Sequence, residues 1–139
     1  MIAAFSVQNQ WGGSSAPWNP AGVWVLGGRP AQNPVSVKVK STDGGATLNG
    51  TMTYAGEGPI GFRGTRLPNG SNNYNVENQW GGSSAPWHAG GTWVIGSRDS
   101  QRVIQLDINS ADNGKTFNGT MTYTGEGPIG FKANNLSAP

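Results

Sequence analysis

The sequence predicts an all-β fold: a single compact ten-stranded antiparallel β-barrel built from two tandem five-stranded repeats. The segment 9–18 recurs without change as segment 78–87, 69 residues later, so the chain is a tandem duplication. Apolar residues alternate with period two, as in Val35, Val37 and Val39, and no window shows the recurrence of an amphipathic helix. Five strands of one copy would leave exposed edges that an equivalent five can pair, which favours a barrel over a sandwich.

The size of the chain supports one shared core. Its 139 residues fit one ordinary domain, whereas a repeat of roughly 70 residues would bury little core alone. With 23 Gly, six Trp, four Phe and three Tyr, the composition is that of a Gly-rich globule and not of a disordered chain. We therefore expect one domain over residues 1–139, with repeat 1 at about 5–67, a linker at about 68–73 and repeat 2 at about 74–136.

Each repeat divides into five expected strands. In repeat 1 the first strand leads into the Trp-Gly-Gly loop, and the others lie around residues 23–26, 35–40 and 47–54 and from Ile60 onward. Between the third and fourth strands stand Asp43-Gly44-Gly45 and, in repeat 2, Asp112-Asn113-Gly114. Such residues tolerate the positive φ of a hairpin turn, so the turn itself accounts for both aspartates.

The composition excludes several classes of function. Because there is no Cys and only one His, His88, thiol chemistry, disulfides and clustered metal ligands are not expected, and neither is a cofactor. The net charge is +2 and the nine Lys and Arg are scattered, so a nucleic-acid partner is not expected. The start of the chain lacks a basic region and a cleavage site, and no apolar run could span a bilayer. We therefore expect a cytoplasmic location and no membrane insertion.

The blocks that are identical in both repeats contain the candidate binding residues. A tryptophan followed by two glycines combines an aromatic face with an approachable backbone, which suits the C–H face of a sugar ring. Arginine would supply donors and glutamate acceptors for hydroxyl groups. In sequence order the candidates are Trp11, Gly12, Gly13, Arg29, Glu57 and Gly58, and then Trp80, Gly81, Gly82, Arg98, Glu126 and Gly127.

Purely structural roles are also possible for the same residues. Trp24 and Trp93 lie in strand-like segments and are expected in the core, while Trp18 and Trp87 could wall either the core or a site. The charged residues could form surface ion pairs that contribute little. A tight turn explains the glycines and proline of Glu-Gly-Pro-Ile-Gly-Phe but not its glutamate.

Binding is favoured over catalysis. Glycoside hydrolysis generally needs two carboxylic acids, and each repeat retains only one outside its turn. A Ser-His-Asp set cannot occur twice with a single His. We predict that the protein is not an enzyme, and a protein-interaction surface without any sugar stays open as the alternative.

The repeated blocks resemble a known family. Asn-Gln-Trp-Gly-Gly-Ser-Ser-Ala-Pro-Trp at 9–18 and Leu-Asn-Gly-Thr-Met-Thr-Tyr-Ala-Gly-Glu-Gly-Pro-Ile-Gly-Phe-Arg at 48–63 are similar to blocks of the Oscillatoria agardhii agglutinin homologue family of antiviral lectins. The resemblance covers essentially the whole chain. It implies a metal-independent barrel with one glycan site at each end, specific for the branched α1-3, α1-6 mannose core of high-mannose N-glycans. Viral envelope glycoproteins are the implied partners, and the lectin would act on extracellular glycans if released.

The resemblance also implies that each site is shared between repeats, although the residues alone allow each repeat to be self-contained. Site 1 would comprise Trp11, Gly12, Gly13, Arg98, Glu126 and Gly127, and site 2 would comprise Trp80, Gly81, Gly82, Arg29, Glu57 and Gly58. Pro30 and Pro34 follow Arg29 but have no counterpart after Arg98, so we expect the two arginine loops to differ in shape. A monomer with two sites, cross-linking glycoproteins, is the expected form.

Overall fold

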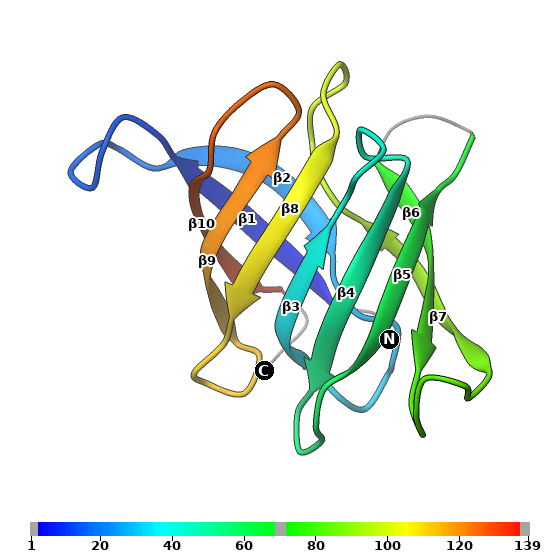
Figure 1. Ribbon diagram of the computed structural model, residues 1–139. Coiled ribbons are helices and arrows are strands. Elements are labelled where there is room, and N and C mark those ends of the chain that lie inside the picture. The colour runs from blue at the N-terminus through cyan, green and yellow to red at the C-terminus, as the bar shows by residue number, and fades with distance from the viewer. Residues whose placement is uncertain (1–2, 69–71, 137–139) are drawn as a thin grey trace.

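The computed structural model describes residues 3–68 and 72–136, and within these ranges the chain forms ten strands and no helix (Figure 1). The strands close into one antiparallel barrel, which confirms the predicted fold class. Of the predicted linker at 68–73, residues 69–71 lie outside the described ranges. Within those ranges, no helix is long and apolar enough to cross a membrane. The strands are β1 Ala4–Gln10, β2 Asn19–Val25, β3 Pro34–Lys40, β4 Thr47–Tyr54, β5 Ile60–Arg66, β6 Asn73–Gln79, β7 Trp87–Val94, β8 Val103–Asn109, β9 Thr116–Tyr123 and β10 Ile129–Asn135.

The order of strands around the barrel divides it differently from the sequence repeats. The order is β1-β10-β9-β8-β3-β4-β5-β6-β7-β2, and β2 pairs again with β1. One half of the barrel is therefore β3 to β7, and the other is β8, β9, β10, β1 and β2 (Figure 1). The first two strands of each repeat thus join the last three strands of the other repeat, so neither repeat is a spatial unit.

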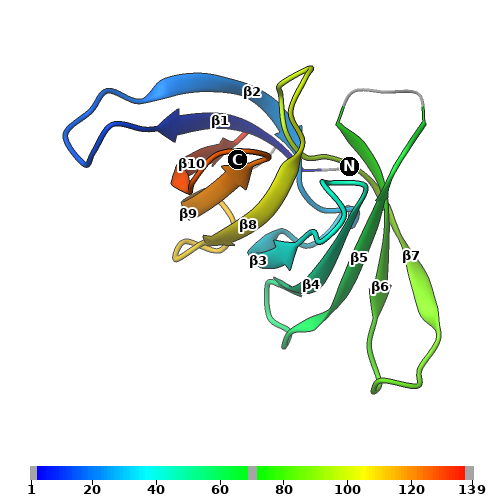
Figure 2. The ribbon, with the colours of Figure 1, turned by 45° about the horizontal axis from the view of Figure 1, so that its top comes forward.

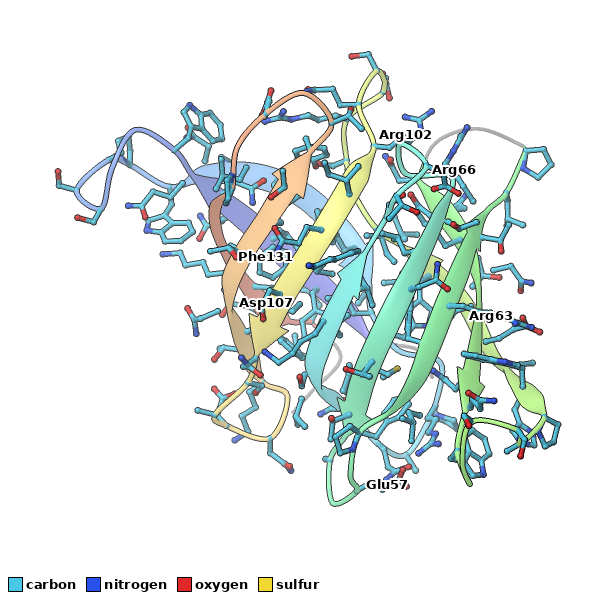
Figure 3. The ribbon with its side chains drawn as sticks, viewed as in Figure 1. Glu57, Arg63, Arg66, Arg102, Asp107 and Phe131 are labelled. Atoms are coloured by element: carbon cyan, nitrogen blue, oxygen red, sulfur yellow. The ribbon has the colours of Figure 1, made fainter. Side chains whose placement is uncertain are left out.

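Two seams join these halves, and both lie on the pseudo-two-fold axis that relates the repeats. At the seam between β3 and β8, Lys38 is directly opposite Asp107, which Figure 3 labels, and the Lys38 Nζ lies 2.8 Å from the Asp107 Oδ1. At the seam between β2 and β7, Val25 is opposite Val94, and this is their single paired position. Both pairs join residues that are equivalent in the two repeats. Figure 2 shows β2 and β7 diverging away from their contact.

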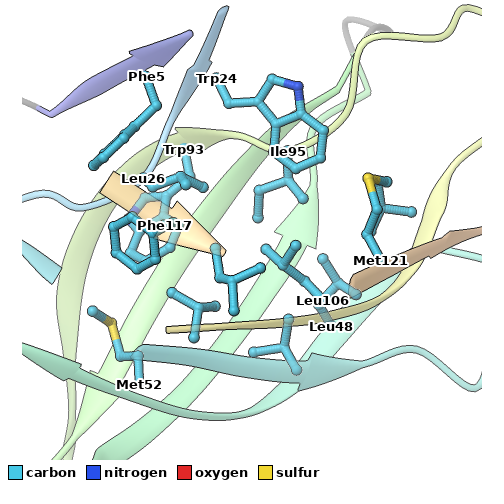
Figure 4. Close-up of a cluster of buried hydrophobic side chains, with 14 of the residues drawn as sticks. Phe5, Trp24, Leu26, Leu48, Met52, Trp93, Ile95, Leu106, Phe117 and Met121 are labelled. Atoms are coloured by element: carbon cyan, nitrogen blue, oxygen red, sulfur yellow. The ribbon is translucent and has the colours of Figure 1, made fainter. Parts of the chain in front are cut away.

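The core fills the barrel with the inward-facing residues of all ten strands (Figure 4). Trp24 and Trp93 are fully buried, which confirms their predicted place in the core. Each indole packs edge-on against a phenylalanine, Trp24 on Phe131 at 5.3 Å and Trp93 on Phe62 at 5.0 Å between ring centroids. Each buried indole N–H also donates a 3.0 Å hydrogen bond to a backbone carbonyl, so the polar atom is satisfied.

The aspartates of the hairpin turns accept hydrogen bonds from residues of the same turns, as predicted. The Asp43 carboxylate accepts hydrogen bonds from the Thr47 amide at 2.9 Å, the Thr47 hydroxyl at 2.7 Å and the Ser41 hydroxyl at 2.8 Å. The equivalent bonds form around Asp112. The bonds donated by these threonines, with those from the serines, lower the pKa of both aspartates to about 2.

Candidate functional site

Two surface hollows of similar volume lie at opposite ends of the barrel. Hollow 1, of about 510 Å³, lies beside the β9–β10 loop, and hollow 2, of about 500 Å³, lies beside the β4–β5 loop. Figure 1 shows these two loops at opposite ends of the barrel. Hollow 1 is lined by Trp11, Arg98, Glu126, Gly127, Pro128 and Ile129. Hollow 2 is lined by Trp80, Arg29, Glu57, Gly58, Pro59 and Ile60. Each hollow therefore takes its tryptophan from one repeat and its arginine and glutamate from the other.

Strand register explains why the hollows are shared. Gln10, the last residue of β1, is opposite Gly130 at the start of β10, so the Trp-Gly-Gly loop of repeat 1 begins beside the β9–β10 loop. In the same way Gln79 at the end of β6 is opposite Gly61 in β5. The pairing of each repeat's first strand with the other repeat's last strand brings these residues together.

The Trp-Gly-Gly loops hold their tryptophans outside the core. In repeat 1, the Gln10 side-chain amide donates hydrogen bonds to the Ser14 and Ala16 carbonyls, at 3.1 and 2.8 Å, and thereby fixes the loop. Trp11 is 50% exposed. Gly12 and Gly13 have φ of 94° and 106°, a conformation that residues with a side chain rarely adopt.

Repeat 2 builds the same loop. Gln79 donates to the Ser83 and Ala85 carbonyls at 3.2 and 2.8 Å, and Trp80 is 44% exposed. Gly81 and Gly82 have φ of 95° and 108°. The four loop glycines do not line the hollows; they shape the loops that carry the two tryptophans.

A hydrogen-bonded set of three side chains forms the polar wall of hollow 2. The Arg29 Nη1 donates to both Glu57 carboxylate oxygens, at 2.9 and 3.0 Å, and to the Gln32 Oε1 at 2.8 Å. Figure 3 labels Glu57 beside the β4–β5 loop. The Gln32 amide nitrogen in turn donates to the Glu57 Oε2 and to the Ala55 carbonyl, both at 3.0 Å. The Arg29 guanidinium also lies 4.1 Å from the centre of the Tyr54 ring.

The polar wall of hollow 1 has the same arrangement. Arg98 donates to Gln101 at 2.8 Å and to the two oxygens of Glu126 at 3.1 and 3.0 Å, and its guanidinium lies 4.1 Å from the Tyr123 ring centre. These bonds differ from those of hollow 2 by at most 0.2 Å. The prolines after Arg29 therefore do not alter this network, because Gln32 and Tyr54 hold Arg29 as Gln101 and Tyr123 hold Arg98. A difference in the shape of the rest of the loop stays a prediction.

The network keeps the glutamates ionised and leaves donor groups free. Hydrogen bonds from Gln32 and then from Arg29 lower the pKa of Glu57, and Gln101 and Arg98 do the same for Glu126. Among the described residues, the hydrogen bonds found for Arg29 all use Nη1. Its Nε and Nη2 therefore remain for a ligand. The Arg29 and Glu57 side chains are 28% and 40% exposed, so the ion pair contributes little to folding.

Gly58 and Gly127 face open space. A Cβ added at either position would meet no protein atom within 4 Å, and neither residue has a positive φ. The fold itself therefore does not require glycine at these positions. The absence of a side chain keeps the backbone beside each glutamate accessible to a ligand.

Trp18 and Trp87 lie beside the hollows and do not line them. The tip of the Trp18 ring lies against Gly130, where an added Cβ would be only 3.1 Å from it, and the Lys132 Nζ lies 4.4 Å from the ring centre. Trp87 packs on Gly61 in the same way, with the Arg63 guanidinium 4.3 Å from its ring centre. These tryptophans pack each loop against the neighbouring strand. Because a side chain at Gly130 or Gly61 would crowd the ring, this packing explains the glycine of Pro-Ile-Gly-Phe.

Sequence reasoning missed the residues that support the site. Gln32 and Gln101 link arginine to glutamate. The sequence did contain a sign of their role, because they are the only identical pair when residues 30–40 are aligned with residues 99–109. The buried Asn9 and Asn78 bind the Gly130 and Gly61 carbonyls at 3.1 Å and thus tie the strands together beside each hollow. The sequence indicated these asparagines only through their place in the identical segments 9–18 and 78–87.

The arrangement offers recognition and no reaction chemistry. Each hollow combines an exposed indole face, a fixed arginine with free donors, an ionised carboxylate and an apolar floor of proline and isoleucine. Within the described ranges, no three His, Cys, Asp or Glu side chains form a group that could hold a metal ion. A ligand with apolar C–H faces and many hydroxyl groups matches this set.

Comparison with known proteins identifies the family. The model of the OAA-family lectin sugar binding domain matches twice, at residues 3–67 and 72–135. The chain is 63% identical to Lectin OAA of Planktothrix agardhii over 96% of this chain and the whole of that protein. It is 72% identical to Lectin SfL-1 of Solieria filiformis over 92% of this chain, but it spans only 48% of that relative's length.

Solved structures agree in fold. The glycan-bound Pseudomonas taiwanensis lectin superimposes with a TM-score of 0.92 at 63% identity, covering 96% of this chain and 98% of that one. The Myxococcus xanthus hemagglutinin, solved in complex with α3,α6-mannopentaose, superimposes with a TM-score of 0.92 at 61% identity, covering 96% of this chain and 50% of that one. These relatives are named as lectins and agglutinins, which are carbohydrate-binding proteins and not enzymes. The chain thus belongs to the OAA family of sugar-binding lectins.

Proposed function

We propose that this lectin binds the branched α1-3, α1-6 mannose core of high-mannose N-glycans at two sites, one in each hollow. The observation that carries the proposal is the pairing, at both ends of the barrel, of an exposed tryptophan with an ion-paired arginine and an open glycine. The complex of the Myxococcus xanthus hemagglutinin with α3,α6-mannopentaose supports this choice of sugar.

The geometry favours a branched oligosaccharide over a single sugar. In each hollow the indole belongs to one repeat, and the arginine and glutamate belong to the other. One ring can cover the indole face, but a second arm is needed to reach the guanidinium and carboxylate as well. Binding of free mannose should therefore be weak, because it forms only part of these contacts.

Two sites at opposite ends would let one molecule join two glycans. Linked sites can raise the apparent affinity by about 10² to 10⁴-fold when both engage the same surface. We infer that the protein cross-links high-mannose glycoproteins, with agglutination and binding of viral envelope glycoproteins as consequences. A cytoplasmic location stays a prediction, with extracellular glycans reached on release.

A glycan array read together with calorimetry tests the proposal. High-mannose N-glycans should dominate the array, and titration with α3,α6-mannopentaose should give two sites per chain. Free mannose should bind far more weakly. Dominance of galactose- or sialic-acid-terminated glycans would refute the proposed specificity, and a blank array would favour the protein-interaction surface instead.

A further inference from the structure

The two hollows differ in what supports the tryptophan. The Trp80 ring is stacked on the His88 imidazole, with ring centroids 4.1 Å apart and an angle of 12° between the planes. The equivalent residue in repeat 1 is Asn19, whose side-chain amide donates a 3.4 Å hydrogen bond to the Pro17 carbonyl. Within residues 3–68 and 72–136, no ring stacks on Trp11.

This difference lies on an exposed loop, where it affects how well the indole is fixed. Trp80 and Trp11 are 44% and 50% exposed, so neither ring is clamped by the core. An imidazole stacked on one face holds the ring plane while the exposed remainder stays available to a sugar. The Arg29 guanidinium lies 5.7 Å from the Trp80 ring centre, so the fixed ring is also placed close to the polar wall.

The rest of the two hollows is closely matched. The bonds among arginine, glutamine and glutamate differ by at most 0.2 Å, and the cavity volumes are about 510 and 500 Å³. A difference in glycan affinity between the sites must therefore come mainly from the tryptophan side. A group already held in its bound orientation loses less conformational freedom on binding, which raises affinity.

We propose that His88 is a positioning residue: by stacking on Trp80 it fixes the aromatic platform of hollow 2 and makes that site the tighter of the two for glycan. The proposal rests on the proposed function of the hollows. His88 acts through Trp80, and an asparagine at this position offers no ring to replace it. The asymmetry of the lectin then follows from one difference between the repeats, His88 against Asn19.

Single-site proteins separate the two hollows. Trp11→Ala leaves hollow 2 and Trp80→Ala leaves hollow 1, and each is titrated with α3,α6-mannopentaose. We expect the hollow 2 protein to bind about two- to tenfold more tightly, the range that one aromatic contact supplies. Adding His88→Asn to the hollow 2 protein should remove this advantage. Adding Asn19→His to the hollow 1 protein should confer it, and this gain would not arise from a general loss of structure.

A spectroscopic readout distinguishes positioning from a general structural effect. His88→Asn should shift the Trp80 indole N–H resonance in the unliganded protein, and His88→Phe should restore tight binding because it keeps a stacked ring. Unchanged affinity in His88→Asn, or failure of His88→Phe to restore it, would overturn the proposal. If neither single-site protein binds the oligosaccharide, the proposed function fails, while the resonance shift still reports whether the stack exists.

Discussion

The pairing of β1 with β10 predicts which double substitutions silence one site and which silence two. Trp11 and Arg98 line the same hollow, so replacing both with alanine should leave hollow 2 intact. Trp11 and Arg29 line different hollows, so replacing both should damage each. If each repeat were self-contained, these two outcomes would be exchanged.

The loss expected at a damaged site follows from exposure. Trp11 is 50% exposed, so about 100 Å² of an indole residue of about 200 Å² is open to a sugar. At about 25 cal/mol per Å², covering that area contributes at most about 2.5 kcal/mol, or about 60-fold in Kd. Loss of charged hydrogen bonds from Arg98 adds about 1.5 kcal/mol or more, so the doubly substituted site should weaken on the order of 10³-fold.

Calorimetric titration with α3,α6-mannopentaose measures both affinity and stoichiometry. The Trp11→Ala/Arg98→Ala protein should bind one oligosaccharide with the affinity of hollow 2 and lose agglutination. The Trp11→Ala/Arg29→Ala protein should show no site of full affinity. The melting temperature serves as the control and should change little, since Trp11, Arg29 and Arg98 all lie outside the core. Trp24→Ala, which opens a cavity in the core, should instead cost about 3 to 5 kcal/mol of stability.

The reversed pattern of results would refute sites shared between the repeats. One full-affinity site in the Trp11/Arg29 protein, together with none in the Trp11/Arg98 protein, would show that each repeat binds glycan alone. A large fall in melting temperature for Trp11→Ala would return that residue to a structural role.

Three further outcomes follow from single features. Gly127→Val should abolish binding at hollow 1 in calorimetry and leave the melting temperature nearly unchanged, since the added Cβ would meet no protein atom within 4 Å; a destabilised protein would contradict this. Gly28→Ala should cost about 1 to 3 kcal/mol in urea denaturation, because the added methyl group would collide with the Gly90 carbonyl, and wild-type stability would refute the close approach of the β2–β3 loop to β7. Glycan binding should persist in EDTA, and restoration of a lost signal by calcium would reveal a metal site.

Acid stability provides a further prediction. The pKa values of Asp43 and Asp112 are lowered from 3.8 to about 2, so the unfolded chain binds protons before the folded one. Their stabilisation is therefore fully present above about pH 3.8 and is lost as the pH falls towards 2. Replacing both with Asn should flatten this part of the curve of melting temperature against pH. A curve unchanged by the replacement would show that the turns do not govern acid stability.

The sequence predicted the barrel, the strands and, for each hollow, the tryptophan, the arginine, the glutamate and one glycine that line it, because duplication exposes what both copies retain. The buried Trp24 and the exposed Trp11 were distinguishable by their neighbours, strand residues in one case and glycines in the other. The residues did not show that the first two strands of each repeat join the other repeat, since pairing within a repeat and pairing between repeats use the same alternation of apolar residues. Only the resemblance to known lectins favoured shared sites.

The positions of supporting side chains were harder to predict for a different reason. Gln32 acts through three short hydrogen bonds that depend on the path of the β2–β3 loop, and no local pattern specifies that path. The stack of His88 on Trp80 joins residues eight positions apart across an irregular loop. Pro30 and Pro34 do not alter the arginine network, because hydrogen bonds, and not the prolines, hold the arginine.

The opposed charges at the seam between β3 and β8 bear on how the two repeats choose each other. A residue that lies on a true two-fold axis meets its own copy, so a dimer of repeat 1 built in this way would place Lys38 beside Lys38, and a dimer of repeat 2 would place Asp107 beside Asp107. Like charges directly opposite each other on neighbouring strands are unfavourable. Fusion into one chain allows the pair to be unlike, Lys38 facing Asp107 at 2.8 Å. At this position of the seam the two repeats therefore complement each other in charge, which two copies of the same repeat would not do.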